Sequence, residues 1–88
     1  MIARTVLITN KRGLHARASA KFVTLASSLP ATVEVEKDGA RVTGTSIMGL
    51  MMLGAAMGDS VTISAVGDGA ETAVAQLAAL VEDKFGEE

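Results

Sequence analysis

The chain has 88 residues with eight basic and ten acidic side chains, a net charge of −2, and no cysteine, tryptophan or tyrosine. Its length predicts one small domain, residues 1–88, and the missing cysteines exclude disulfide bonds and thiolate metal sites. The acidic balance and the lack of aromatic platforms argue against nucleic-acid binding. The longest apolar stretch, residues 47–57, is too short to insert across a membrane, so we expect a soluble cytoplasmic protein.

The first part of the chain predicts a strand followed by a helix. Residues 5–9 are rich in β-branched side chains and run into a polar, glycine-containing loop at residues 10–13. From Ala16 to Leu29, apolar and small residues recur at steps of three and four, and Pro30 stops the helix.

The middle of the chain predicts a hairpin and a short helix. Residues 32–36 alternate between apolar and polar side chains, as a half-buried strand does. Asp38-Gly39 is a hairpin turn signal that leads into a second short strand at residues 40–43. Ser46 then opens a brief apolar helix over residues 47–53, which Gly54 can end.

The last third predicts one strand and one helix. Residues 60–66 read as a strand, and the helix runs from residue 70 to about residue 85. The order β-α-β-β-α-β-α in so short a chain predicts an α+β fold, with one antiparallel or mixed sheet and helices on one face. In the last helix we expect Val74, Leu77, Val81 and Phe85 to be buried, and Glu71, Glu82 and Asp83 to face solvent.

His15 is the only histidine, and it stands directly before the first predicted helix. The backbone N–H groups of Ala16 and Arg17 have no acceptor within that helix, and with the helix dipole they favour an anion. The guanidinium of Arg17 can bind phosphate oxygens as a fork. Because a neutral imidazole is a nucleophile, these residues predict a site that accepts and holds a phosphoryl group.

Two other interpretations stay open at this point. A lone histidine at a helix start is more often only a polar residue of that helix end, and an adjacent arginine is often only a solvated charge. A metal site at His15 is disfavoured, because the chain offers neither a cysteine nor a second histidine as a further ligand.

Two motifs resemble one known family. Gly-Leu-His-Ala-Arg at residues 13–17 resembles the phosphorylation site of HPr, the histidine-containing phosphocarrier of bacterial phosphotransferase systems, and residues 45–51 resemble its second hallmark segment. The resemblance covers essentially the whole chain. It implies an open-faced sandwich with a four-stranded antiparallel sheet and three helices on one face.

The same resemblance implies roles and partners. His15 would carry the phosphoryl group on Nδ1, and Arg17 would help to bind it, without a cofactor. The donor would be enzyme I charged by phosphoenolpyruvate, and the acceptor a type IIA protein or domain. In the family's sugar-transport members Pro usually stands at the position of Ala18. The sequence Ala-Arg-Ala-Ser looks more like the nitrogen-related (NPr-like) branch, which leaves the pathway open between sugar uptake and nitrogen or carbon regulation.

The short apolar helix is the expected docking surface. It is apolar all round, and four of the five methionines lie between residues 48 and 57, where flexible thioethers suit a surface that fits several partners. We expect Leu50 and Leu53 to pack inside, and methionine as core filler is the alternative. The expected docking residues are Ile47, Met48 and Met51, extended by Ala20, Thr24 and Ser27 on the first helix.

Ser46 has a structural role and an implied regulatory one. A serine at this position caps the short helix. The resemblance adds phosphorylation by an HPr kinase/phosphorylase, as in some bacteria, and the added charge would alter docking.

Three functions compete. The leading one is a phosphoryl carrier with a phosphohistidine intermediate, which is not a turnover enzyme on its own and which we expect to be a monomer. The second is a non-catalytic interaction module that docks through Ile47, Met48 and Met51, with His15 only as a helix cap. The third, a small-ligand domain of ferredoxin-like type, predicts a pocket and gives no reason for Arg17 beside His15.

Overall fold

The computed structural model describes residues 1–87, and the elements in that range follow the predicted order β-α-β-β-α-β-α. No helix in that range is long and apolar enough to cross a membrane. The strands are β1 (Ile2–Leu7), β2 (Thr32–Lys37), β3 (Ala40–Thr43) and β4 (Ser60–Val66), and the helices are α1 (Ala16–Ser27), α2 (Ile47–Met52) and α3 (Ala70–Glu82), followed by the short 3₁₀ helix η1 (Lys84–Gly86).

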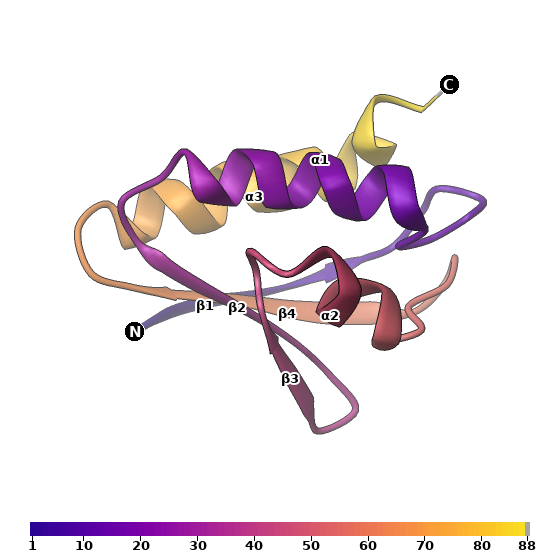
Figure 1. The fold of residues 1–88 in the computed structure, drawn as a ribbon, viewed down its shortest axis with the longest axis horizontal. Helices are drawn as coiled ribbons and strands as arrows, with labels where there is room; N and C mark the ends of the chain where they lie inside the picture. The colour runs from indigo at the N-terminus through magenta and orange to yellow at the C-terminus, as the bar shows by residue number, and fades with distance from the viewer. Residues whose placement is uncertain (88) are drawn as a thin grey trace.

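The four strands form one antiparallel sheet in the order β1-β4-β2-β3. β4 lies inside the sheet, where Val61 pairs with Val6 of β1 and Ile63 pairs with Val35 of β2. Helices α1 and α3 lie side by side over the sheet, and the shorter α2 lies beside β3 (Figure 1). This arrangement confirms the predicted α+β sandwich with a four-stranded antiparallel sheet and three helices.

One apolar core joins the sheet to all three helices. The sheet contributes residues such as Val35 and Ile63, and α1 contributes Phe22, which is 2% exposed. Leu50 of α2 is completely buried, so the short helix belongs to the same core. The burial predicted for the last helix is confirmed. Val74, Leu77, Val81 and Phe85 are all buried, and Glu71, Glu82 and Asp83 are exposed.

Several predicted boundaries were wrong by a few residues. The first strand covers Ile2–Leu7 and not residues 5–9, because its ladder with β4 begins where Ile2 pairs with Ala65. Helix α1 ends at Ser27 and not at residue 29, since the Leu29 N–H turns back to the carbonyl of Ala26. Other boundaries moved by one residue: β2 extends to Lys37, and α2 ends at Met52 with Leu53 as its cap.

The end of α3 differs most from the prediction. The helix stops at Glu82, because Lys84 and Phe85 adopt positive φ angles of 57° and 56° that reverse the chain. Phe85 is still completely buried, so the periodic pattern indicated its burial correctly but its conformation wrongly. The reversal carries residue 87 to the start of α1, beside His15.

Candidate functional site

His15 caps α1, as predicted. Its backbone is extended (φ −74°, ψ −178°), and its carbonyl accepts the N–H of Ser19 at 2.9 Å. Its Nδ1 accepts the backbone N–H of Arg17 at 3.2 Å. A side-chain acceptor at this position satisfies one of the unpaired donors of the first turn. The lone pair of Nδ1 therefore points at the positive end of the helix.

The loop before His15 is held by backbone contacts. The Leu14 N–H donates to the carbonyl of Ala55 at 3.0 Å, and Gly13 has a φ of 63°. A Cβ on Gly13 would lie 2.3 Å from the Ala55 oxygen, so only glycine fits this close approach. This packing fixes the direction in which the chain enters α1, and with it the position of the imidazole.

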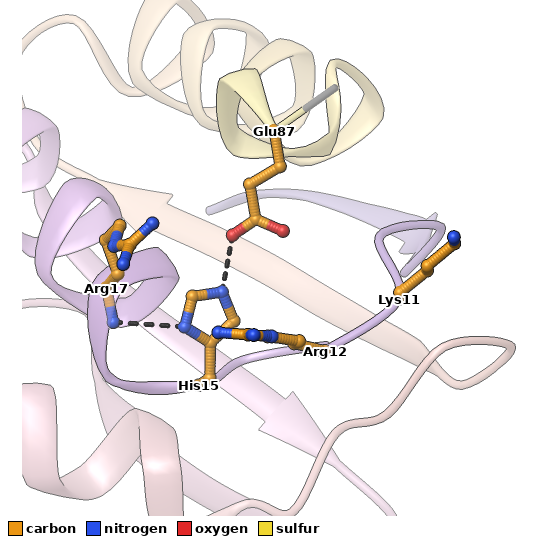
Figure 2. Close-up of a pocket in the computed structure, with 5 residues that line it drawn as sticks. All are labelled: Lys11, Arg12, His15, Arg17 and Glu87. Carbon is orange, nitrogen blue, oxygen red and sulfur yellow. Dashed lines mark hydrogen bonds and ion pairs between the residues drawn. The ribbon is translucent and has the colours of Figure 1, made fainter.

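The imidazole lies in an open pocket of about 400 Å³ lined by Lys11, Arg12, His15, Arg17 and Glu87 (Figure 2). Three of these five side chains are cations and one is a carboxylate. Within residues 1–87 the guanidinium groups of Arg12 and Arg17 make no hydrogen bond or ion pair, and both side chains are exposed. A pocket with an excess of positive charge at a helix N-terminus suits an anion such as a phosphoryl group.

A carboxylate from the far end of the chain contacts the other nitrogen of the ring. Glu87 Oε2 pairs with His15 Nε2, and Glu87 Oε1 accepts Nδ2 of Asn10 at 3.2 Å (Figure 2). The hydrogen bond from His15 lowers the pKa of Glu87, partial burial opposes this, and the bond from Asn10 and the charge of Arg17 lower it further. The two ring nitrogens of His15 thus have different partners, a backbone donor at Nδ1 and a carboxylate at Nε2.

The predicted docking residues of α2 are on the surface. Ile47 and Met51 are each 42% exposed and Met48 is 70% exposed, while Leu50 and Leu53 are buried as expected. We call Ile47, Met48 and Met51 the α2 face. Met52, which was not in the predicted set, is also exposed.

On α1 the predicted residues separate into two groups. Ala20 and Thr24 line a shallow, mainly apolar groove of about 490 Å³ between α1 and α3, together with Arg17. Ser27 is exposed but does not line that groove. α1 packs against α2, so the two sets of predicted residues come from neighbouring helices (Figure 1).

Ser46 caps α2, as predicted. Its Oγ accepts the Gly49 N–H at 2.9 Å, and its backbone is extended. The side chain is half-buried at the start of the α2 face.

Four residues near His15 were not predicted as site residues: Asn10, Lys11, Arg12 and Glu87. The basic pair Lys11-Arg12 was interpreted only as part of a loop, although its position four and three residues before His15 was a usable signal. Among residues 1–87, no group of three or more His, Cys, Asp or Glu side chains is placed to hold a metal ion.

Fold and site together define a small α+β domain with one half-buried histidine at a helix N-terminus. Residues 2–83 match the family model described as the PTS HPr component phosphorylation site, and the chain therefore belongs to the HPr family of the phosphotransferase system. Members of this family are phosphocarriers, and this membership supports the same role here.

Relatives and solved structures agree over nearly the full length. The chain is 44% identical to the phosphocarrier protein HPr of Cupriavidus necator, over 99% of this chain and 98% of that protein. It is 38% identical to the phosphocarrier protein NPr of Shewanella violacea, over 98% of this chain and 94% of that protein. The crystal structure of HPr-C-His from Thermoanaerobacter tengcongensis superposes with a TM-score of 0.95, at 49% identity, and covers 100% of this chain and 99% of that one.

Proposed function

We propose that His15 accepts a phosphoryl group on Nδ1 from phospho-enzyme I and passes it to a type IIA protein or domain. The observation that carries this proposal is the placement of Nδ1 at the first turn of α1, in a pocket with three cations. The phosphoryl group would derive from phosphoenolpyruvate. Family membership implies interaction with phosphotransferase enzymes of these two kinds.

The geometry supports a transfer that depends on positioning and charge. The lone pair of Nδ1 attacks phosphorus while the bond from phosphorus to the donor breaks, and the donor keeps that electron pair. Nδ1 then no longer accepts the Arg17 N–H, which becomes free to donate to a phosphoryl oxygen, together with the N–H of Ala16. The guanidinium groups of Arg17 and Arg12 and the ammonium of Lys11 balance the phosphoryl charge.

We propose that the donor and the acceptor use one docking surface in turn. It consists of the α2 face with Ala20, Thr24 and Ser27 of α1. An exposed apolar patch beside the reacting residue is what a relay protein needs, and a free patch fits a monomer. We further propose that residues 1–88 act as one domain in the cytoplasm.

Ser46 is the proposed regulatory site, phosphorylated by an HPr kinase/phosphorylase where one is present. A phosphate at a helix N-terminus is compatible with the fold, because the dipole favours negative charge there. The same phosphate would place negative charge at the start of the α2 face and alter docking.

The pathway remains a choice between sugar uptake and nitrogen or carbon regulation, since relatives of both the HPr and NPr names match over nearly the full chain. The second candidate function is a non-catalytic module that docks through the α2 face. The exposure of two methionines and one isoleucine on that face favours it. In that case His15 serves only as the helix cap.

The test is transfer of labelled phosphate from phosphoenolpyruvate through the cognate enzyme I, followed by addition of a IIA protein. The matched control is His15→Asn, because asparagine is a good helix cap but cannot form the phosphoimidazole. The proposal expects label on the wild type that the IIA protein discharges, and none on the variant. Absence of label on the folded wild type would contradict the carrier function and leave the docking module.

A further inference from the structure

The C-terminal segment is anchored to the body of the protein, so the position of Glu87 is set by the fold. Phe85 is completely buried, and its carbonyl accepts Nζ of Lys21 at 2.8 Å. The N–H of Glu87 donates to the carbonyl of Lys84 at 2.9 Å, which closes the last turn. These contacts hold the Glu87 carboxylate against the imidazole of His15, 72 residues away in sequence.

Asn10 donates a hydrogen bond to the same carboxylate. Its side chain is 2% exposed, and Nδ2 donates both to the carbonyl of Gly13 at 2.8 Å and to Glu87 Oε1 at 3.2 Å. Its Oδ1 is buried and has no partner within residues 1–87. A buried, unpaired carbonyl is unfavourable. Asn10 therefore acts through the two hydrogen bonds that its Nδ2 donates. These bonds connect the loop before His15 to Glu87.

The contacts of the two ring nitrogens select one tautomer of the imidazole. Nδ1 accepts a hydrogen bond from Arg17 N–H, so it carries a lone pair. Nε2 faces a carboxylate, which only accepts, so it carries the proton. Both contacts favour the form in which Nδ1 is free to attack.

We propose that Glu87, oriented by Asn10, is a positioning residue for phosphoryl transfer: it holds the proton on Nε2 of His15 and stabilises the positive charge that the ring gains at Nδ1. This inference rests on the proposed function of His15. When Nδ1 bonds to phosphorus, its lone pair becomes the new bond and the ring becomes cationic, while the proton stays on Nε2, shared with the carboxylate. A buried carboxylate supports a catalytic histidine in serine proteases in the same way.

Two variants of Glu87 separate its charge from its hydrogen bond. Glu87→Gln keeps an acceptor for the Nε2 proton but removes the charge, and Glu87→Ala removes both. Glu71→Gln, at an exposed position in the first turn of α3, is the matched control for loss of one carboxylate. Thermal unfolding of each variant verifies that it is folded.

The first readout is the ¹⁵N NMR spectrum of the His15 ring in the unphosphorylated protein. The proposal expects the wild type, Glu71→Gln and Glu87→Gln to show the tautomer protonated at Nε2. Glu87→Ala should show a mixture of both tautomers. A contact that is only structural would not change this signature, and an unchanged spectrum for Glu87→Ala would overturn the proposal.

The second readout is the single-turnover rate of transfer from phospho-enzyme I. Glu87→Ala should lower the maximal rate by about tenfold, by analogy with the lower end of the loss seen when a metal-ligating histidine loses its outer carboxylate, with the half-saturating concentration unchanged. Glu87→Gln should lower it less. An unchanged or faster rate in Glu87→Ala would overturn the proposal, and a faster one would show that Glu87 obstructs the site. Failure of the wild type to accept phosphate at all would contradict the carrier function itself.

Discussion

Arg17 donates its backbone N–H to Nδ1 of His15 over 3.2 Å, which makes this ring nitrogen the cap of helix α1. The imidazole is thereby fixed before any partner binds. In the proposed transfer, the Arg17 N–H that fixes the ring is also the group that is released when Nδ1 takes up phosphorus. Under that proposal, helix capping and phosphoryl binding are two uses of one N–H group.

Replacement of Gly13 by alanine should destabilise the protein by about 3 kcal/mol or more, because it combines a positive φ with a severe clash. The new Cβ would lie 2.3 Å from the Ala55 oxygen, a backbone atom that cannot move aside. Gly54→Ala is the matched control, with a φ of 67° and no atom within 4 Å. It should cost only about 1 kcal/mol in urea unfolding. If both substitutions lowered the free energy of unfolding by the same amount, the close contact with Ala55 would have no energetic role.

Two substitutions of Ser46 should separate stability from docking. Ser46→Ala removes the acceptor of the Gly49 N–H and should cost about 1 kcal/mol in the free energy of unfolding. Ser46→Asp retains a capping oxygen, so its stability should stay within about 0.5 kcal/mol of the wild type. The aspartate should nevertheless weaken transfer from phospho-enzyme I, while the alanine should not. If Ser46→Ala slowed transfer and Ser46→Asp did not, the result would argue against docking over this end of α2.

A charge on the α2 face should weaken docking without unfolding the protein. Met48 is 70% exposed, so Met48→Glu disturbs no core contact and should leave the unfolding midpoint unchanged. It should raise the half-saturating concentration for phospho-enzyme I about tenfold or more, because changes at the centre of an interface cause the largest losses of binding energy. Val66→Glu, at an exposed position at the end of β4, is the control and should leave that concentration unchanged. Identical kinetics for both variants would exclude Met48 from the docking surface.

The lowered pKa of Glu87 predicts a pH-dependent part of the stability. The hydrogen bond from His15 is its main cause, and Asn10 and Arg17 act in the same direction. A carboxyl whose folded-state pKa lies below its ordinary 4.5 stabilises the fold above that value, and this contribution is lost as the pH falls through the folded-state pKa. The difference in unfolding free energy between wild type and Glu87→Gln should therefore shrink as the pH falls from about 5 to about 3. A difference that grows on acidification would contradict this assignment.

Local patterns predicted most of the fold. Alternation in β2 and the Asp38-Gly39 turn placed the hairpin, and the residues with helical spacing in α1 and α3 are mostly the buried ones. The pattern failed where local and tertiary preferences differ. The four-residue step from Val81 to Phe85 fits a continuing helix, but the chain reverses through two positive φ angles and still buries Phe85.

The candidate site was predictable only in its local part. His15 and Arg17 are two residues apart, so the helix start that joins them is visible in the sequence. Glu87 is 72 residues from His15 along the chain, and its contact depends on the reversal at Lys84 and Phe85. Asn10 looks like an ordinary loop residue, because nothing local indicates that its amide is buried.

The most direct test of the central claim is ³¹P and ¹⁵N NMR of the protein after phosphorylation by its cognate enzyme I. The account predicts one phosphorus resonance coupled to Nδ1 of His15, with the proton retained on Nε2, and none in His15→Asn. A phosphorus resonance coupled to Nε2, or one that persists in His15→Asn, would contradict it.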